Sequence, residues 1–547
     1  MKKGIYILIF ILTVASVLRL VSLSEYPDGF HQDEAFNLWN SYCLVKTGHD
    51  QAGVSWPIFY ARGLGANYST LFLYILLPFT GTLGLHVYTS RLAAALLGII
   101  TVFLTYIAGK RLFNHYAGLA GAGILCVAPW HLHLSRLAHE GCVCPFSVMA
   151  FITLLLMSHL SLDDNDRGVP RPVFASLAGL VAGISCYAYQ PNRIFYPFFL
   201  LFLLLLNLRD FINLIKNRRG FLSVLVFTVV FFLVFAPLIY MHIADPHGIN
   251  RHGDRQMLWK SMNLSAVQVV AGIIYRYLNH FNPYYLFVQS EKIVNYFPDA
   301  IIFQLYMMPL AISGMIFLIY RIKHSKSARF LLAFLLAYPI SDSLGVFQSP
   351  NPLRSAPGMI SLVLLSAFGA VHGFQYLWKK KKNLAYVITA FISFLFIVNN
   401  IWYLYFYFFI ANNLPGYYHL YQADLKEACL WLKPRINEAD AVFVTTNGMN
   451  QPYILSLVYL AYEPEQWLKD EHLIYTPGEW DIHVRYGKMN FIYGDSWLPA
   501  ISKLQENGKN DRVIFILRPE ELHLTDPVYE IKERAGNPCL YIYDKVL

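Results

Sequence analysis

The chain has 547 residues, of which 56% are apolar and only 14% are charged, and its mean hydropathy is +0.42. Soluble domains carry about 25% charged residues, so this composition excludes a cytosolic enzyme, a disordered protein and a nucleic-acid-binding protein. Aromatic residues make up 16% of the chain, as is typical of helices that cross membrane interfaces. In a membrane protein Lys and Arg first of all indicate the topology, so the net charge of +9 is not in itself a sign of a polyanionic partner.

The first predicted element is a membrane span over residues 5–23, preceded by Lys2 and Lys3. An apolar run of this length crosses about 30 Å of hydrocarbon. A cleaved signal peptide has a shorter apolar core and a small-residue cleavage site. We therefore expect an uncleaved span whose N-terminus is cytoplasmic.

The first outer loop, residues 24–86, carries two adjacent carboxylates in the run Phe30-His31-Gln32-Asp33-Glu34. Flanking aromatic residues would hold Asp33 and Glu34 near the membrane surface, where either supplies a general base to a reaction on a lipid-linked substrate. The alternative is an acidic first turn that favours a helix dipole. Arg62 is a weaker candidate for binding an anion, since long loops often hold solvated charges.

Residues 68–85 are apolar but are interrupted by Pro78, Gly81 and Gly84. Counting this segment as a span would invert the orientation of everything after it. We therefore predict an interfacial or re-entrant helix on the outer face, and an additional true span is the alternative.

Ten further spans are predicted, which brings the total to eleven. Their ranges are 87–108, 117–134, 143–160, 173–190, 191–208, 220–240, 300–320, 330–347, 357–377 and 384–410. Arg136 and Glu140 lie at the outer end of the third span, and because they are four residues apart we expect them to share one helical face. This pair is either an ordinary stabilising contact or a site that orients substrate groups.

Two isolated arginines lie beside proline-containing turns on the predicted outer face, Arg193 at the junction of the fifth and sixth spans and Arg354 before the tenth. Each either extends to lipid headgroups or binds a lipid phosphate, because a guanidinium presents a planar fork of donors. Asp342, near the outer end of the ninth span, is an intramembrane carboxylate and a functional candidate without an identifiable partner.

The distribution of Lys and Arg supports this topology. Basic residues cluster in the segments 2–3, 110–111, 167–171, 209–219, 321–329 and 379–382, all on the same predicted side. That asymmetry is the positive-inside pattern.

After residue 410 the composition becomes polar, and short β-type runs at 441–445, 513–517 and 539–543 alternate with helical patterns at 425–432 and 453–462. The pattern predicts an exoplasmic α/β domain over 411–547, which follows an all-α membrane domain over 1–410. Its sequence contains no glycine-rich phosphate loop, and a scaffold or acceptor-recognition role is the default.

Several of these motifs resemble those of a known group of proteins. They are His31-Gln32-Asp33-Glu34; Tyr88-Thr89-Ser90-Arg91-Leu92; Ala128-Pro129-Trp130-His131 with Ser135, Arg136 and Glu140; and Tyr187-Ala188-Tyr189 with Arg193. Together they are similar to the C-type (GT-C) membrane glycosyltransferases, in particular glycosyltransferase family 39 with the protein O-mannosyltransferases and the lipid A aminoarabinose transferases. The resemblance extends to about residue 210, is patchy to 360 and is absent beyond 410.

The resemblance implies a polyprenyl-phosphate-linked sugar donor, an exoplasmic active site in the plasma or inner membrane, and an interfacial helix in the first outer loop. It implies that Asp33 is the catalytic base, with Glu34 beside it, and that Glu140 is a further acidic residue, although many relatives have Asp there. Arg193 and Arg354, followed by Arg136 and Arg62, are then the expected phosphate ligands, and His31 and Tyr189 contact substrate.

Three other functions stay open: an oligosaccharide transferase using a diphosphate-linked glycan, a transporter of lipid-linked glycans, and an inactive scaffold. A transporter favours broken helices at the bilayer midplane and repeated halves, whereas the unusual residues here lie at the outer ends of spans. No zinc-type spacing occurs among the cysteines and histidines. We predict no certain cofactor, leave a divalent metal open, and cannot name the acceptor.

Overall fold

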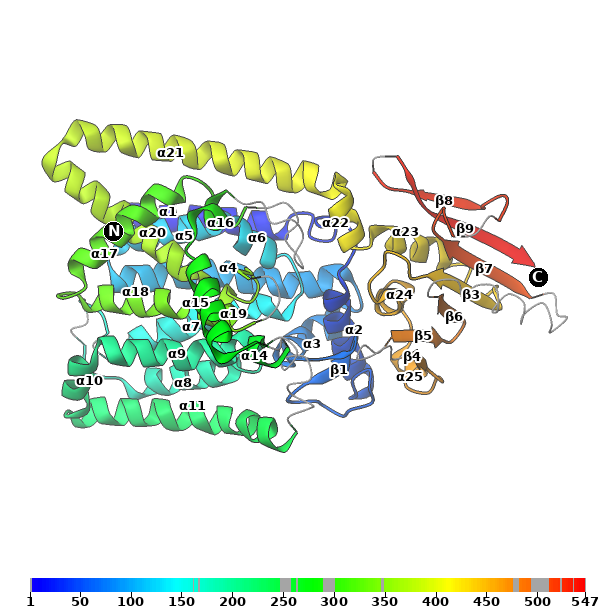
Figure 1. Cartoon of the computed structure of the whole chain (residues 1–547), viewed down its shortest axis with the longest axis horizontal. Helices are drawn as coiled ribbons and strands as arrows, with labels where there is room; N and C mark the ends of the chain where they lie inside the picture. The colour runs from blue at the N-terminus through cyan, green and yellow to red at the C-terminus, as the bar shows by residue number, and fades with distance from the viewer. Residues whose placement is uncertain are drawn as a thin grey trace. The chain divides into compact units, whose positions relative to one another are not determined.

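The computed structural model describes residues 2–160, 162–165, 168–245, 257–261, 264–288, 301–345, 349–475, 482–492, 511–521, 524–534 and 536–546. The chain forms two compact units (Figure 1). The helical unit contains Met1–Val21 and Ala94–Leu404, and the mixed unit contains Ser22–Ala93 and Tyr405–Leu547.

A helix overlaps each of the eleven predicted span ranges. These helices are α1 (Lys2–Leu20), α4 (Val87–Leu112), α5 (His115–Val127), α7 (Val143–Met157), α8 (Pro172–Ser185), α9 (Gln190–Leu206), α11 (Arg218–Ala244), α17 (Met307–Arg321), α18 (Lys326–Ala337), α20 (Ala356–Lys380) and α21 (Lys382–Tyr405). In Figure 1, α8, α9, α11 and α18 run side by side. Small residues permit the closest approaches, since a Cβ at Gly179 would lie 2.5 Å from the Phe227 carbonyl oxygen.

Five helical segments of the described chain are long and apolar enough to cross a membrane on their own: Val87–Leu112, Glu140–Met157, Arg218–Ala244, Ala356–Lys380 and Lys382–Asn413. A sixth is the pair α9 and α10 (Leu208–Ile215), which is bent by 88°. Among the other predicted spans, α5, α8, α17 and α18 have 12–15 residues, and the apolar part of α1 is Gly4–Leu20. The count of eleven crossings therefore stays a prediction.

Two predicted spans, the third and the ninth, are shorter and more broken than expected. The third span ends at Val127, and a short helix α6 (Pro129–Leu134) follows after a break at Ala128. The backbone there is extended because a residue that precedes proline avoids the helical region. Helix α18 stops at Ala337, because Pro339 has no backbone N–H with which to continue the helix, and a further short helix α19 (Ile340–Ser343) begins.

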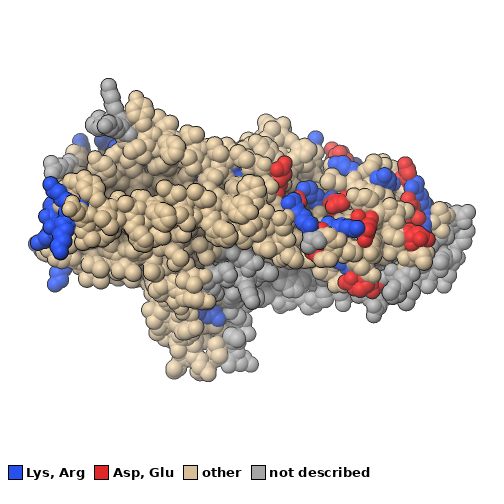
Figure 2. All heavy atoms as spheres, turned by 90° about the horizontal axis from the view of Figure 1, so that it is seen from above, with Lys and Arg blue, Asp and Glu red and all other residues tan. Residues whose placement is uncertain are grey.

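Lys and Arg gather at the end of the helical unit where α20 meets α21, as the face drawn in Figure 2 shows. The last turn of α20 carries Lys379 and Lys380, and α21 begins at Lys382. The helix surface next to them in this view is uncharged. Charge at one end of an apolar helix pair is what the positive-inside prediction requires.

Among the described residues of the mixed unit, seven strands form one sheet in the order β4-β5-β6-β3-β7-β9-β8. The strands are β3 (Ala441–Thr445), β4 (Leu473–Tyr475), β5 (Ile482–Tyr486), β6 (Met489–Ile492), β7 (Arg512–Leu517), β8 (Tyr529–Lys532) and β9 (Pro538–Val546). The central strand β3 is parallel to both β6 and β7, and the outer pairs are antiparallel. The β-type runs noted in the sequence correspond to β3, β7 and β9.

Helices α23 (Ala423–Leu432), α24 (Pro452–Leu460) and α25 (Pro464–Trp467) share a core with one face of this sheet. Strand residues alternate between the two faces, as the two-residue period of a strand requires. Val442 and Val444 belong to the helix-covered core, whereas Phe443 packs in a separate cluster on the other face.

The helix-covered core also contains residues from the first outer loop. Phe30, Phe36 and Trp39 are fully buried in the same cluster as Leu425 and Ile454. The predicted division at residue 410 assigned loop 24–86 to the membrane domain, whereas the structure groups it with the C-terminal residues. Loop 24–86 is grouped with the C-terminal residues because its apolar side chains complete the core of the mixed unit.

Within that loop, α2 (Gln32–Thr47) packs against α3 (Leu71–Leu83), and a two-stranded hairpin of β1 (Ala61–Gly63) and β2 (Ala66–Tyr68) lies between them in the sequence. Helix α3 occupies the segment predicted as interfacial and contains Pro78. Its position at a membrane interface stays a prediction.

Candidate active site

The predicted base lies in the first turn of α2. His31 is the N-cap: its Nδ1 accepts a hydrogen bond from the Asp33 backbone N–H at 3.2 Å, and Glu34 Oε2 accepts one from the His31 N–H at 3.2 Å. This reciprocal capping satisfies backbone donors that no helical turn can. Asp33 and Glu34 lie in the first turn of α2, where their negative charges favour the helix dipole. The acidic-turn interpretation and the catalytic-base interpretation are therefore compatible.

Glu34 is fully buried and forms a bidentate ion pair with Arg91 of α4. Arg91 Nε lies 2.9 Å from Oε1, and Nη2 lies 3.0 Å from Oε2. The same guanidinium donates to the carbonyl oxygens of Leu23, Pro27 and Gly29. Glu34 thus serves to fix the chain that leads into α2, and its carboxylate is enclosed by this pairing.

Asp33 has a different environment from its neighbour. Its carboxylate Oδ1 accepts a hydrogen bond of 2.8 Å from the Tyr68 hydroxyl at the end of β2, and its side chain keeps 12% of its surface exposed. His31 Nδ1 lies 3.8 Å from Oδ2. A carboxylate oriented by a hydroxyl and still reachable is suited to accept a proton.

Arg62 lies on β1, exposed, with its guanidinium 6.0 Å from the centre of the Tyr60 ring. Its neighbour in the fold is Asp50, whose oxygen accepts the N–H groups of Ala52 and Val54. Burial raises the pKa of the Asp50 carboxyl above its usual value, and these hydrogen bonds only partly oppose the effect.

Asp28 anchors the chain just before His31. Burial alone would raise the pKa of this carboxyl, but hydrogen bonds from Lys426 (2.7 Å) and Arg534 (2.9 Å) outweigh it and hold the pKa below its usual value. The Phe30 N–H also donates to the Tyr421 carbonyl at 2.6 Å. Residues 28–34 are therefore positioned by the C-terminal part of the mixed unit.

The remaining predicted residues belong to the helical unit. Arg136 is fully buried and donates from Nη1 to the Leu18 carbonyl of α1 at 2.8 Å. Helix α6 ends at Leu134, and Glu140 begins a separate 3₁₀ turn, η1 (Glu140–Cys142). The expectation of one helical face shared by Arg136 and Glu140 was therefore wrong, because the chain leaves the helix between them.

Glu140 gathers with His139 and Tyr189. Glu140 is buried, its Oε2 lies 3.6 Å from His139 Nε2, and the His139 ring packs edge-on against Tyr189 at 5.5 Å between centres. His139 Nδ1 accepts the Gly141 N–H at 2.8 Å, which orients the ring. The structure thus brings together two predicted residues that are about fifty positions apart.

Arg193 lies in the first turn of α9 and is half-buried. Its Nε donates to the Cys186 carbonyl at 3.0 Å. Among the described residues its terminal nitrogens have no protein partner. A partly buried guanidinium whose terminal nitrogens are available is the arrangement that favours binding of an anion.

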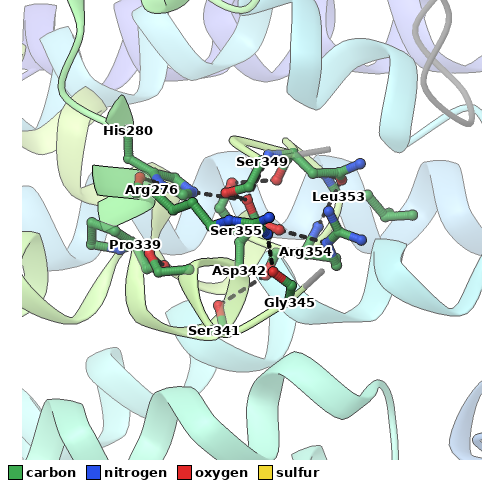
Figure 3. Close-up of polar contacts among 12 residues, drawn as sticks. Arg276, His280, Pro339, Ser341, Asp342, Gly345, Ser349, Leu353, Arg354 and Ser355 are labelled. Atoms are coloured by element: carbon green, nitrogen blue, oxygen red, sulfur yellow. Dashed lines mark hydrogen bonds and ion pairs between the residues drawn. The ribbon is translucent and has the colours of Figure 1, made fainter. Parts of the chain in front are cut away.

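Arg354 belongs to a polar cluster at Asp342 (Figure 3). Asp342 is fully buried, and Arg354 Nε lies 2.5 Å from its Oδ1. His280 Nε2 lies 3.1 Å from Oδ2, which also accepts hydrogen bonds from the Ser349 hydroxyl (2.9 Å) and the Asn351 N–H (2.7 Å). The carboxylate that lacked a partner in the sequence therefore accepts hydrogen bonds from Arg354, Ser349 and Asn351, and His280 lies beside it.

Sequence reasoning missed Tyr68 and His280. Tyr68 stood only at the start of the predicted interfacial segment 68–85, although Gly63-Leu64-Gly65 signals the hairpin that brings it to Asp33, with positive φ at Leu64 and Gly65. His280 lies more than sixty residues before Asp342 and carries no local signal.

No group of three His, Cys, Asp or Glu side chains able to hold a metal ion occurs among the described residues. All seven cysteines are buried thiols.

The fold was compared with solved structures. The structure of ArnT from Cupriavidus metallidurans bound to undecaprenyl phosphate is 14% identical, covers 98% of this chain and 97% of its own, and has a TM-score of 0.55. AglB from Archaeoglobus fulgidus, in complex with an inhibitory peptide and a dolichol-phosphate, is 12% identical, covers 83% of this chain and 63% of its own, and has a TM-score of 0.52. The chain has the GT-C fold.

Sequence comparison gives a shorter match. A dolichyl-monophosphooligosaccharide–protein glycotransferase AglB from Haloferax volcanii is 30% identical over 163 residues, which are 27% of this chain and 15% of that protein. No family model matches the sequence. The likeness to the GT-C glycosyltransferases confirms the resemblance drawn from the motifs, and at these identities it establishes the fold.

Proposed function

We propose that the chain is an inverting glycosyltransferase of the plasma or inner membrane, which moves a sugar from a polyprenyl-phosphate-linked donor to a hydroxyl acceptor on the exoplasmic face. The observation that carries the proposal is the likeness, over 98% of the chain, to an ArnT structure bound to undecaprenyl phosphate. The different environments of Asp33 and Glu34 support it, because only one of the two acids is locked in a buried ion pair with Arg91.

In this mechanism Asp33 is the general base. As the acceptor hydroxyl attacks the anomeric carbon, Asp33 takes its proton, the new glycosidic C–O bond forms, and the bond from the anomeric carbon to the phosphate oxygen breaks on the opposite face. The anomeric centre is therefore inverted. Tyr68 orients the Asp33 carboxylate through its 2.8 Å hydrogen bond, and His31 holds the first turn of α2 in place.

The departing lipid phosphate develops negative charge, which fixed cations stabilise strongly in a low-dielectric site. Arg193 and Arg354 are the proposed ligands of this phosphate. Arg136 is a weaker candidate because it is buried against α1, and Arg62 is weaker because it is exposed. Glu140, with His139 and Tyr189 beside it, is proposed to contact the sugar or the acceptor.

The experiment compares the wild type with Asp33→Asn and Glu25→Gln in liposomes, using a panel of polyprenyl-monophosphate sugars. Glu25 is exposed and lies in the same loop, so Glu25→Gln controls for the loss of one negative charge. We expect release of polyprenyl phosphate by the wild type and by Glu25→Gln, and none by Asp33→Asn. Full activity of Asp33→Asn would refute the assignment of the base.

A second candidate is transfer of an oligosaccharide from a polyprenyl-diphosphate donor. The AglB likeness favours it, since both the fold and a 163-residue stretch of sequence match proteins of that name. Diphosphate-linked glycans in the same panel separate the two. Turnover of those donors alone, by folded protein, would replace the monophosphate proposal.

A further inference from the structure

In the Asp342 cluster of the helical unit, Arg354 has a role in the proposed reaction, whereas Asp342 itself has none so far. Its two carboxylate oxygens have separate partners. Oδ2 accepts hydrogen bonds from the Ser349 hydroxyl and the Asn351 N–H and lies 3.1 Å from His280 Nε2, whereas Oδ1 faces Arg354 (Figure 3). His280 is itself fixed, because its Nδ1 bonds to the Arg276 carbonyl at 2.8 Å. One oxygen thus secures the carboxylate, and the other is directed at the guanidinium.

Arg354 is fixed at three points. Its N–H donates to Asn351 Oδ1 at 3.2 Å, its carbonyl accepts the Ser341 hydroxyl at 2.9 Å, and its Nε contacts Asp342. Arg354 keeps 14% of its side-chain surface exposed, whereas Asp342 keeps none. An anion that reaches this cluster therefore meets the guanidinium and not the carboxylate.

Burying a carboxylate is costly, and an apolar replacement of a buried ion pair is often no less stable. A carboxylate that fixes an accessible arginine has a use beyond stability, since cations held in place before the reaction lose no orientational freedom when charge develops. The neighbouring bonds to Oδ2 keep the carboxylate from rotating with the arginine.

We infer that Asp342 is a positioning residue that holds Arg354 in the orientation in which it binds the phosphate of the lipid-linked donor. This inference rests on the proposed function, in which Arg354 is a phosphate ligand. Asp342 acts only through Arg354, so its removal has no effect on phosphate binding once Arg354 is absent. That dependence separates it from a residue that merely stabilises the fold.

The test is a double-mutant cycle with Asp342→Asn, Arg354→Ala and the double variant, in purified full-length protein. The readouts are the Kd for undecaprenyl phosphate and the donor KM and kcat. We expect Asp342→Asn to raise Kd and KM about tenfold, equivalent to 1.4 kcal/mol, with a smaller change in kcat. The double variant should bind no more weakly than Arg354→Ala alone.

The matched control is Asp210→Asn, which removes a carboxylate from another arginine pair of the helical unit, 2.7 Å from Arg329 Nη2, and should leave Kd and KM unchanged. Ser349→Ala is a milder second variant that keeps the ion pair and removes one bond to Oδ2. Its Kd should rise about threefold, and only when Arg354 is present.

Independent, multiplicative effects of Asp342→Asn and Arg354→Ala in a wild type that binds the lipid would overturn the inference and leave the proposed function standing. Failure of folded wild type to bind undecaprenyl phosphate at all would overturn both.

Discussion

Glu34→Gln tests whether the second acid of the pair is structural. The carboxylate and Arg91 have no exposed side-chain surface, and two N–H···O contacts of 2.9 and 3.0 Å join them. Removing one partner of a buried pair costs about 3–5 kcal/mol. For a unit of 150–250 residues each kcal/mol lowers Tm by about 2–4 °C, so we expect a decrease on the order of 6–20 °C.

The assay is thermal unfolding of purified protein in detergent, with Glu25→Gln as the exposed control from the same loop. Replacing Arg91 with Met as well should not restore stability, because the carbonyl groups of Leu23, Pro27 and Gly29 would then lose their donor. An unchanged Tm in Glu34→Gln, together with lost sugar transfer, would refute the structural role and make Glu34 part of the chemistry.

Three further predictions concern the mixed unit and the topology. Burial lowers the pKa of His483 to about 4, below its value of about 6.5 in the unfolded chain. The neutral imidazole therefore contributes about 3 kcal/mol to the free energy of unfolding above pH 6.5, and this contribution is lost as the pH falls towards 4. The free energy of unfolding of His483→Gln should depend less on pH between about 6.5 and about 4, and a pH dependence identical to that of the wild type would contradict this. Trp467→Ala should lower the free energy of unfolding by about 3–5 kcal/mol. Because Trp467 Nε1 donates to the Gln51 carbonyl at 2.9 Å, backbone hydrogen exchange should become faster in residues 49–56 as well as in residues 464–470. Faster exchange in only one of the two segments would argue against their shared core. All seven native cysteines are buried, so a single introduced cysteine can report the orientation of the chain. A membrane-impermeant maleimide should label Glu438→Cys, in the predicted exoplasmic domain, in intact cells, and Lys216→Cys, in the predicted cytoplasmic segment 209–219, only after permeabilisation. The reverse result would invert the predicted orientation.

The positions of the helices were predictable because long apolar runs and proline breaks are local features. Each predicted span overlaps a helix, whereas the ninth span, predicted over 330–347, contains a helix end at Ala337 that was not predicted. Strand β3 was predicted to the residue. The number of membrane crossings was not settled in this way, because several of the helices are too short to be judged by length and hydropathy.

Partners far apart in the sequence could not be predicted. Asp342 was recognised as an unusual carboxylate, but its contact with His280 depends on how two distant helices pack. The buried pair of Glu34 and Arg91 was hidden for the same reason, although both residues lie in motifs that carry the GT-C resemblance. Hydropathy also assigned the first outer loop to the membrane domain, because a periodicity does not reveal which core receives an apolar side chain.

The shared core of the mixed unit imposes an order on biosynthesis. About 300 residues separate Ala93 from Tyr405, and at 5–20 residues per second their synthesis takes about 15–60 s. Until then Phe30 has no Tyr421 carbonyl to bond, and Trp39 has no Trp467 to pack against. The segment that carries Asp33 therefore acquires its final environment last, so a chain whose synthesis stops early is left without an ordered base.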